Sequence, residues 1–78
     1  MKLDEDSGVP YYQQLYDLLK KRILSGELQG RVPSVKSLMQ EYGLGRATPE
    51  RVLGMLAADG LIRAVIGKGY YTVRKDQG

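Results

Sequence analysis

A glycine turn between two short amphipathic segments is the feature that most constrains how this chain can fold. The two segments and their turn occupy residues 33–60, and the turn is centred on Gly43. Glycine at that position supplies the positive φ that a sharp helix end needs, and Leu44 provides an apolar plug for the turn. Ser34 is a good N-cap for the helix that precedes it. We therefore expect two short helices joined tightly, with the rest of the chain supporting them.

The segment before this unit predicts a supporting helix over Pro10–Ser25, because proline suits the first helical position and Gly26 can end the helix. One face carries apolar residues at i, i+3, i+4, i+7 and i+11 spacing. These residues are Tyr12, Leu15, Tyr16, Leu19 and Ile23. Lys20-Lys21-Arg22 lies near the helix end, where it is either a solvated cationic end that suits the helix dipole or a set of phosphate contacts.

The two helices of the central unit are predicted to begin at Ser34 and, for the longer second one, at Gly45 or Thr48. A start at Gly45 extends that helix to Asp59. A start at Thr48 follows from Thr48-Pro49-Glu50, which reads as an N-cap, a first-position proline and an acidic first turn. The residues expected to face inward are Val35, Leu38 and Met39 in the shorter helix and Pro49, Val52, Leu53 and Leu56 in the longer one.

A β-hairpin is predicted after these helices, with strands at Leu61–Val65 and Tyr70–Val73 around the turn Ile66–Gly69. A very short strand is also expected at Arg31-Val32. The fold class is therefore mainly α with a small β-hairpin. The predicted organisation is a flexible acidic arm (1–8), one folded domain (9–73) and a polar tail (74–78).

Composition excludes several classes of function. The 78 residues form one small domain and include no cysteine and no histidine, so disulfide and thiolate chemistry are excluded and a zinc site is not expected. No apolar run approaches the ~20 residues of a membrane span, and the acidic N-terminus is not a signal peptide. We expect no enzyme activity, because no nucleophile–base pair is present, no cofactor, and a cytoplasmic location at the bacterial nucleoid.

The net charge of +3 is unevenly distributed along the chain. The whole chain has 12 basic and 9 acidic residues. Residues 1–6 contain one lysine and three of the acidic residues, so residues 7–78 contain eleven basic and six acidic residues. A basic excess of this kind suits an anionic partner such as nucleic acid.

Five short motifs fall in the order that a winged helix-turn-helix requires, and together they resemble the DNA-binding domain of the GntR family of bacterial transcription regulators. The likeness covers roughly residues 9–73 and rests on the five motifs in register. They are Pro33-Ser34, Tyr42-Gly43-Leu44, Arg46-Ala47-Thr48, Asp59-Gly60-Leu61-Ile62 and Gly67-Lys68-Gly69.

The resemblance implies sequence-specific binding of double-stranded DNA, with the third helix in the major groove and the hairpin tip, or wing, at the minor groove. By position, Ser34 and Lys36 match residues that hold the DNA backbone, and Arg46 and Thr48 match helix residues that touch bases and phosphates. The candidate DNA-binding residues are Ser34, Lys36, Arg46, Ala47, Thr48, Glu50, Arg51, Gly67, Lys68 and Gly69.

The sequence departs from the family at the start of the third helix. Gly45 replaces the usual serine or threonine cap, Pro49 replaces an apolar residue, and Glu50 stands where an arginine often reads a base; the connector over 28–33 is also shorter. Glu50 can accept from cytosine N4, repel phosphates or tether a neighbouring arginine. Arg51 can contact DNA, form an ion pair with Glu50, or be exposed to solvent. The site preference of this protein should therefore depend on residues 45–51.

Several side chains keep more than one interpretation. The six tyrosines are expected in the core and at its edges, with Tyr70 or Tyr71 as the exception, because neighbouring strand residues point to opposite faces. Tyr11 and Leu18 lie beside the apolar stripe, where they either cover the edge of the core or form a patch for dimer contact. Gly54, inside the third helix, costs helix stability and could admit another backbone.

Two further readings of the whole chain stay open. The alternative function is a protein–protein interaction module on a winged-helix scaffold, since a fold does not fix a function; single-stranded nucleic-acid binding ranks third. Regulators of the resembled family also carry an effector-binding, dimer-forming domain. None is found in these residues, so the chain is expected to be either a fragment or a stand-alone binder, acting as a homodimer or side by side on DNA.

Overall fold

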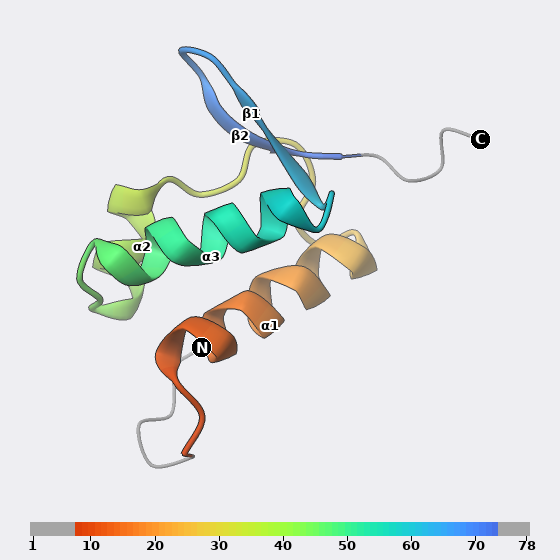
Figure 1. Ribbon diagram of the computed structural model, residues 1–78. Coiled ribbons are helices and arrows are strands. Elements are labelled where there is room, and N and C mark those ends of the chain that lie inside the picture. Colours follow the sequence, from red (N-terminus) through yellow and green to blue (C-terminus); the bar gives the residue numbers. More distant parts are fainter. Residues whose placement is uncertain (1–7, 74–78) are drawn as a thin grey trace.

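Three helices and a two-stranded hairpin follow one another in a computed structural model that describes residues 8–73 (Figure 1). The elements are α1 (Tyr11–Ser25), α2 (Val35–Tyr42), α3 (Ala47–Ala58), β1 (Ile62–Val65) and β2 (Gly69–Thr72). The predicted fold class is therefore confirmed. Apart from Gly8, the predicted arm and the polar tail lie outside the described residues.

Helix α1 begins one residue later than its sequence predicts, because Pro10 is the N-cap and not the first helical residue. Its backbone is extended (φ −56°, ψ 148°), and its carbonyl accepts the N–H of Gln14 at 3.2 Å. Gly26 ends the helix as expected, in the left-handed conformation with φ 86°.

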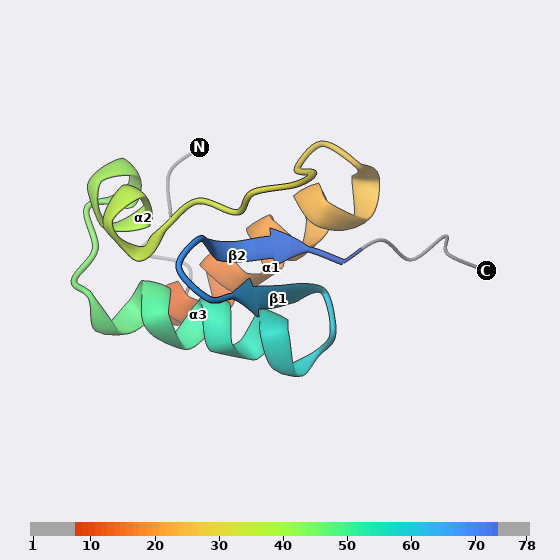
Figure 2. The same ribbon diagram turned by 90° about the horizontal axis from the view of Figure 1, so that it is seen from above.

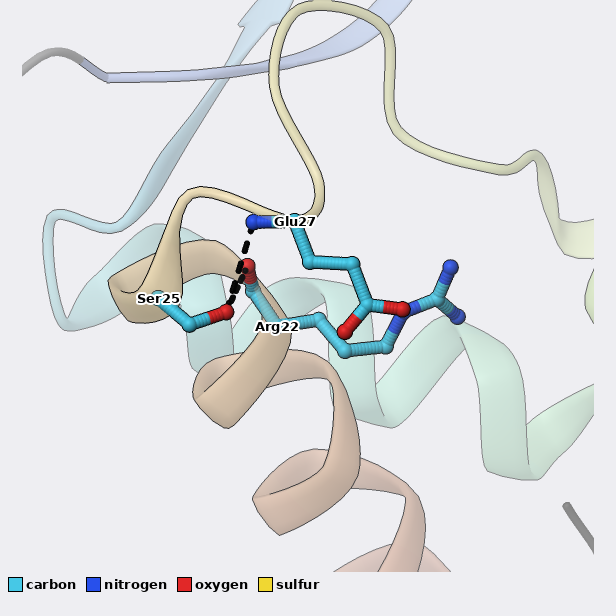
Figure 3. Close-up of polar contacts among 3 residues, drawn as sticks. All are labelled: Arg22, Ser25 and Glu27. Carbon is cyan, nitrogen blue, oxygen red and sulfur yellow. Dashed lines mark hydrogen bonds and ion pairs between the residues drawn. The ribbon is translucent and has the colours of Figure 1, made fainter.

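The end of α1 is closed by side chains as well as by glycine (Figure 3). The Ser25 hydroxyl donates to the Arg22 carbonyl at 3.1 Å and accepts the backbone N–H of Glu27 at 3.3 Å. The Glu27 carboxylate lies 3.4 Å from Nε of Arg22. Arg22 is therefore engaged at the helix end, which favours the solvated-end interpretation for this member of the basic triplet.

Helix α2 has the boundaries that its sequence predicts. The Oγ of Ser34 accepts the N–H of Ser37 at 3.1 Å, which satisfies one of the backbone donors that every helix start leaves free. Gly43 ends the helix with φ 66°. Leu44 then packs against the core as the plug of the turn.

The core lies between α1, α2, α3 and the base of the hairpin. It consists of ten buried residues: Leu15, Tyr16, Leu19, Val32, Leu38, Val52, Leu53, Leu56, Leu61 and Ile62. The predicted inner faces of α1 and α3 are confirmed, and Pro49 is also fully buried. Burial of apolar surface provides the main stabilisation of such a domain, because no disulfide contributes.

The hairpin is antiparallel, and its register pairs Ile62 with Thr72 and Val65 with Gly69. The first strand is one residue shorter than predicted, because β1 begins after Leu61 and ends at Val65 as expected. The second strand is shifted by one residue, to Gly69–Thr72. The expected short strand is present as a bridge between Arg31 and Tyr71. Figure 2 shows the connector running beside β2 on its way to α2.

In this sheet Tyr70 packs against the core, whereas Tyr71 pairs with Arg63 on one side and Arg31 on the other. Tyr71 is not among the residues packed against the core, so the two tyrosines differ in their surroundings, as the alternation predicts. In the part of the chain that the structure describes, no helix is both long and apolar enough to cross a membrane.

A tyrosine–carboxylate hydrogen bond joins α1 to the end of α3. The Tyr16 hydroxyl donates to Oδ2 of Asp59, the C-cap of α3. This hydrogen bond, with burial and the Asp59 charge, raises the pKa of Tyr16 above its ordinary value of 10.0. Burial likewise raises the pKa of Tyr42.

We expect Tyr16→Phe to lower the free energy of unfolding by roughly 1–2 kcal/mol at neutral pH, because a hydrogen bond to a charged acceptor is lost. The pKa of Tyr16 is higher in the folded state than in the unfolded state. The hydrogen bond of Tyr16 therefore contributes fully to the free energy of unfolding below pH about 10, and this contribution is lost as the pH rises through the folded-state pKa. Denaturant titrations from pH 7 to 11 should show the variant losing less stability than the wild type. Equal losses in both proteins would contradict this role.

Candidate nucleic-acid interface

Three exposed segments lie toward one side of the molecule: the start of α2, the start of α3 and the tip of the hairpin. In both views the hairpin tip points toward the side on which α2 and the first turn of α3 lie (Figures 1 and 2). All ten predicted contact residues belong to these segments. Nine of them are exposed, and only Thr48 is half-buried. None of the ten belongs to the core cluster.

The first turn of α3 corrects both predicted starting points. The helix begins at Ala47, and Arg46 is its N-cap, with helical dihedrals and no side-chain capping bond. Thr48 is therefore a helical residue and not a cap. The first bond of the helix runs from the N–H of Glu50 to the carbonyl of Arg46 at 3.2 Å. Because that bond bypasses Pro49, the proline fits inside the first turn, where N–H groups have no partner in any case.

Arg46 and Glu50 form an ion pair one turn apart on α3. Nε of Arg46 donates to Oε2 of Glu50 at 2.8 Å, and both side chains are more than half exposed. The expectation that Glu50 tethers a neighbouring arginine is therefore confirmed, although the partner is Arg46 and not Arg51. The contact uses only Nε, so the terminal guanidinium nitrogens of Arg46 have no partner among the described residues.

Arg51 is held by an aromatic ring from another helix. Its guanidinium carbon lies 3.8 Å from the centre of the Tyr12 ring of α1, a distance at which a cation is attracted to the ring face. Sequence reasoning placed Tyr12 only in the apolar stripe and missed this contact. No spacing rule links residues 12 and 51, so the three-dimensional structure was needed to find it.

The start of α2 offers a backbone terminus with a cation beside it. Ser34 caps the helix and also donates its hydroxyl hydrogen to Oγ of Ser37 at 3.2 Å. Lys36 in the first turn is exposed and takes part in no ion pair within residues 8–73. Free N–H groups at a helix start attract anions, so this segment is suited to a phosphate.

The hairpin tip is a glycine-flanked lysine. Gly67 and Gly69 have φ values of 79° and 108°, which L side chains rarely adopt. The N–H of Lys68 donates to the carbonyl of Val65 at 2.9 Å and closes the turn. A Cβ built on either glycine would meet nothing within 4 Å, so the backbone on both sides of Lys68 is open to approach.

Other predicted candidates lie away from this side or are engaged elsewhere. Lys20 lies over the Tyr16 ring at 5.6 Å, and Tyr11 and Leu18 are half-buried at the edge of the stripe. Among the described residues, no cluster of acidic side chains could hold a metal ion. The site is therefore a surface of cations and backbone termini rather than a pocket.

Gly54 lies on the exposed side of α3, beyond the two arginines. A Cβ built at this position meets nothing within 4 Å, and the backbone has no positive φ. No packing inside the domain therefore requires glycine here.

Three helices with a capped turn between the second and third, followed by a hairpin, define a winged helix-turn-helix domain. The model of the family described as "Bacterial regulatory proteins, gntR family" matches residues 11–72. The chain belongs to the gntR family. This finding confirms the resemblance that the five sequence motifs indicated.

Individual relatives agree with the family assignment. The HTH-type transcriptional regulator RB1450 of Rhizobium meliloti (strain 1021) is 35% identical over 77 residues, which are 96% of this chain and 32% of the relative. The HTH-type transcriptional repressor NagR of Bacillus subtilis (strain 168) is 32% identical over 73 residues, or 91% of this chain and 30% of NagR. The chain thus spans about a third of the length of these curated relatives.

The domain also has the same fold as a protein whose structure has been solved in complex with DNA. The crystal structure titled "AraR(DBD) in complex with operator ORX1" superposes with a TM-score of 0.83 at 26% identity. The likeness covers 94% of this chain and 95% of that one. The region compared is therefore essentially the whole of both chains.

We expect Gly54→Ala to raise the free energy of unfolding by about 0.5–1 kcal/mol, because alanine favours the helix and fits the open space. The matched control is Gly43→Ala, which should lower it by about 1 kcal/mol or more, since φ at Gly43 is left-handed. Thermal denaturation of both variants checks the pair. A loss of stability in Gly54→Ala would show that something inside the domain requires glycine there.

Proposed function

We propose that this domain binds double-stranded DNA in a sequence-specific manner and serves bacterial transcription regulation, with α3 in the major groove and the hairpin tip at the minor groove. The observation that carries the proposal is the exposed first half of α3. It presents two arginines, each held by another side chain, and the hairpin tip adds a glycine-flanked lysine toward the same side of the molecule. None of these residues is part of the core cluster.

Arg46 is the proposed reader of a base. Arginine matches the O6 and N7 acceptors of guanine through two parallel N–H donors. Because Glu50 occupies only Nε of Arg46, the two terminal nitrogens remain available for such a contact. Glu50 then acts mainly as a tether, which limits how far the guanidinium can turn toward a wrong base.

Arg51 is the second proposed reader or phosphate contact on α3. An exposed arginine loses rotamer freedom when it binds, and this loss lowers the affinity. Because the Arg51 side chain already lies over the Tyr12 ring, part of that loss has occurred before binding. The half-buried Thr48 and the exposed Ala47 complete the contact surface; Ala47 can meet a thymine methyl.

Ser34, Lys36, Gly67, Lys68 and Gly69 are the proposed positioning contacts. Contacts to phosphate and sugar fix the register of a protein on DNA but carry little sequence information. The start of α2 and the hairpin tip both lie toward the side of the molecule on which α3 begins (Figure 2). They would therefore contact the DNA backbone beside the groove that α3 enters.

The comparisons support the proposal without identifying a site. AraR(DBD) is a protein described in complex with an operator, and NagR is described as a repressor. We propose that this domain likewise binds an operator in the cytoplasm. Pairing as a homodimer, or side by side, would place symmetric half-sites about one helical turn apart.

The proposal predicts that Arg46→Ala lowers affinity for a site selected from random duplexes by roughly 10- to 100-fold, because a bidentate base contact is worth ~1–3 kcal/mol. Fluorescence anisotropy in moderate salt measures the affinity. Raising the salt should weaken wild-type binding steeply, because phosphate contacts release counterions. The matched control is Lys21→Ala, an exposed cation on α1 that should change affinity less than about twofold. Unchanged affinity in Arg46→Ala would overturn the assignment of Arg46, and a flat salt response would exclude DNA as the partner.

The Tyr12–Arg51 contact should be visible as coupling in a double-mutant cycle. Tyr12→Leu removes the ring face and should lower DNA affinity by about two- to fivefold, the value of an exposed cation–ring contact. Tyr12→Phe keeps the ring and should retain wild-type affinity. In an Arg51→Ala background Tyr12→Leu should have almost no further effect; additive losses would show that Tyr12 acts only through stability.

A further inference from the structure

Ile66 is the most exposed large apolar side chain in the described region. It is 99% exposed, compared with 53% for Leu24 and 42% for Val9. The isoleucine therefore contributes nothing to the core, and a lone exposed apolar residue is by itself ordinary. What sets Ile66 apart is its place at the apex of the hairpin, between Val65 and Gly67 and two residues before Lys68.

The turn places this side chain at its outer corner. The N–H of Lys68 donates to the carbonyl of Val65, so Ile66 and Gly67 are the two central residues of a four-residue turn. Gly67 has the positive φ that the second central position of a type II turn requires. The first central position commonly holds proline, and polar residues dominate such turns. Folding alone therefore does not account for a β-branched aliphatic residue at this corner.

Its surroundings fit one occupant, the minor groove of duplex DNA. Proteins that bind this groove frequently place an aliphatic side chain against or between base pairs. Lys68, two residues further along the tip, supplies a cation for the phosphates that flank the groove. Gly67 and Gly69 leave the flanks of the tip open, with nothing within 4 Å of a built Cβ, so the groove walls can close around it.

We propose that Ile66 packs against the floor of the minor groove and makes the protein prefer an A·T pair there. This inference rests on the DNA binding proposed above. In the minor groove, G·C differs from A·T by the N2 amino group of guanine. An isoleucine pressed against that group would displace its water and offer no acceptor, which is unfavourable. The wing would thus exclude guanine rather than recognise a base by hydrogen bonding.

The experiment uses the selected duplex with a single base pair changed beneath the wing, outside the α3 footprint. Three versions carry A·T, G·C or inosine·C, because inosine keeps the major-groove face of guanine but lacks the N2 amine. We expect the wild type to bind the A·T and inosine·C duplexes about equally and the G·C duplex roughly 5- to 10-fold more weakly. Ile66→Asn should reduce this ratio to nearly one, and Ile66→Val should retain it.

The matched control is Lys68→Ala at the same tip. It should weaken binding to all three duplexes equally and lower the salt slope by about one unit, while the ratio among the duplexes stays unchanged. An unaltered ratio in Ile66→Asn, or inosine·C binding as weakly as G·C, would overturn the inference and leave DNA binding intact. Failure of selection to enrich any duplex would instead overturn the proposed function, and with it this inference.

Discussion

The packing of α1 against α3 is the interaction on which the rest of the structure depends. Leu15 and Leu19 from α1 meet Val52, Leu53 and Leu56 from α3, and all five are essentially fully buried. A chain of 78 residues without cysteine must obtain most of its stability from such burial, because small domains have little other resource. Every proposed contact residue extends outward from this packed pair or from an element attached to it.

The connector that leads to α2 is joined to the hairpin by backbone hydrogen bonds and by one bond from the N–H of Gly30 to Oγ1 of Thr72. The N–H of Val32 donates to the Tyr70 carbonyl at 2.9 Å, and the N–H of Thr72 donates to the Gly30 carbonyl at 2.8 Å. The connector therefore runs alongside β2 and forms an isolated bridge to it at Arg31 and Tyr71 (Figure 2). This arrangement fixes the start of α2 relative to the hairpin, so the proposed DNA-backbone contacts of these two segments keep a constant separation.

The sequence was sufficient to predict the helices, the turn glycines and the apolar faces, because each depends on local spacing. The sequence was insufficient at the start of α3, where one local pattern predicted a start at Gly45 and another a start at Thr48. Neither pattern included the bond from Glu50 to Arg46 that decides the boundary. The tether between Arg46 and Glu50 follows from i, i+4 spacing, whereas the stacking of Arg51 on Tyr12 joins residues far apart in the chain. The exposure of Ile66 likewise depended on the exact turn, and not on its composition.

The ion pair between Arg46 and Glu50 has a further consequence for how such a domain would search a genome. On arbitrary DNA, phosphates must compete with a carboxylate 2.8 Å away for the charge of Arg46. In the proposed complex a correctly placed guanine would engage only the terminal nitrogens of Arg46, so it would make its contact without breaking the ion pair. The carboxylate would therefore weaken random encounters more than the intended one. Since a genome offers about 10⁶–10⁹ competing sites, a single acidic residue on the contact surface would shorten each unproductive visit.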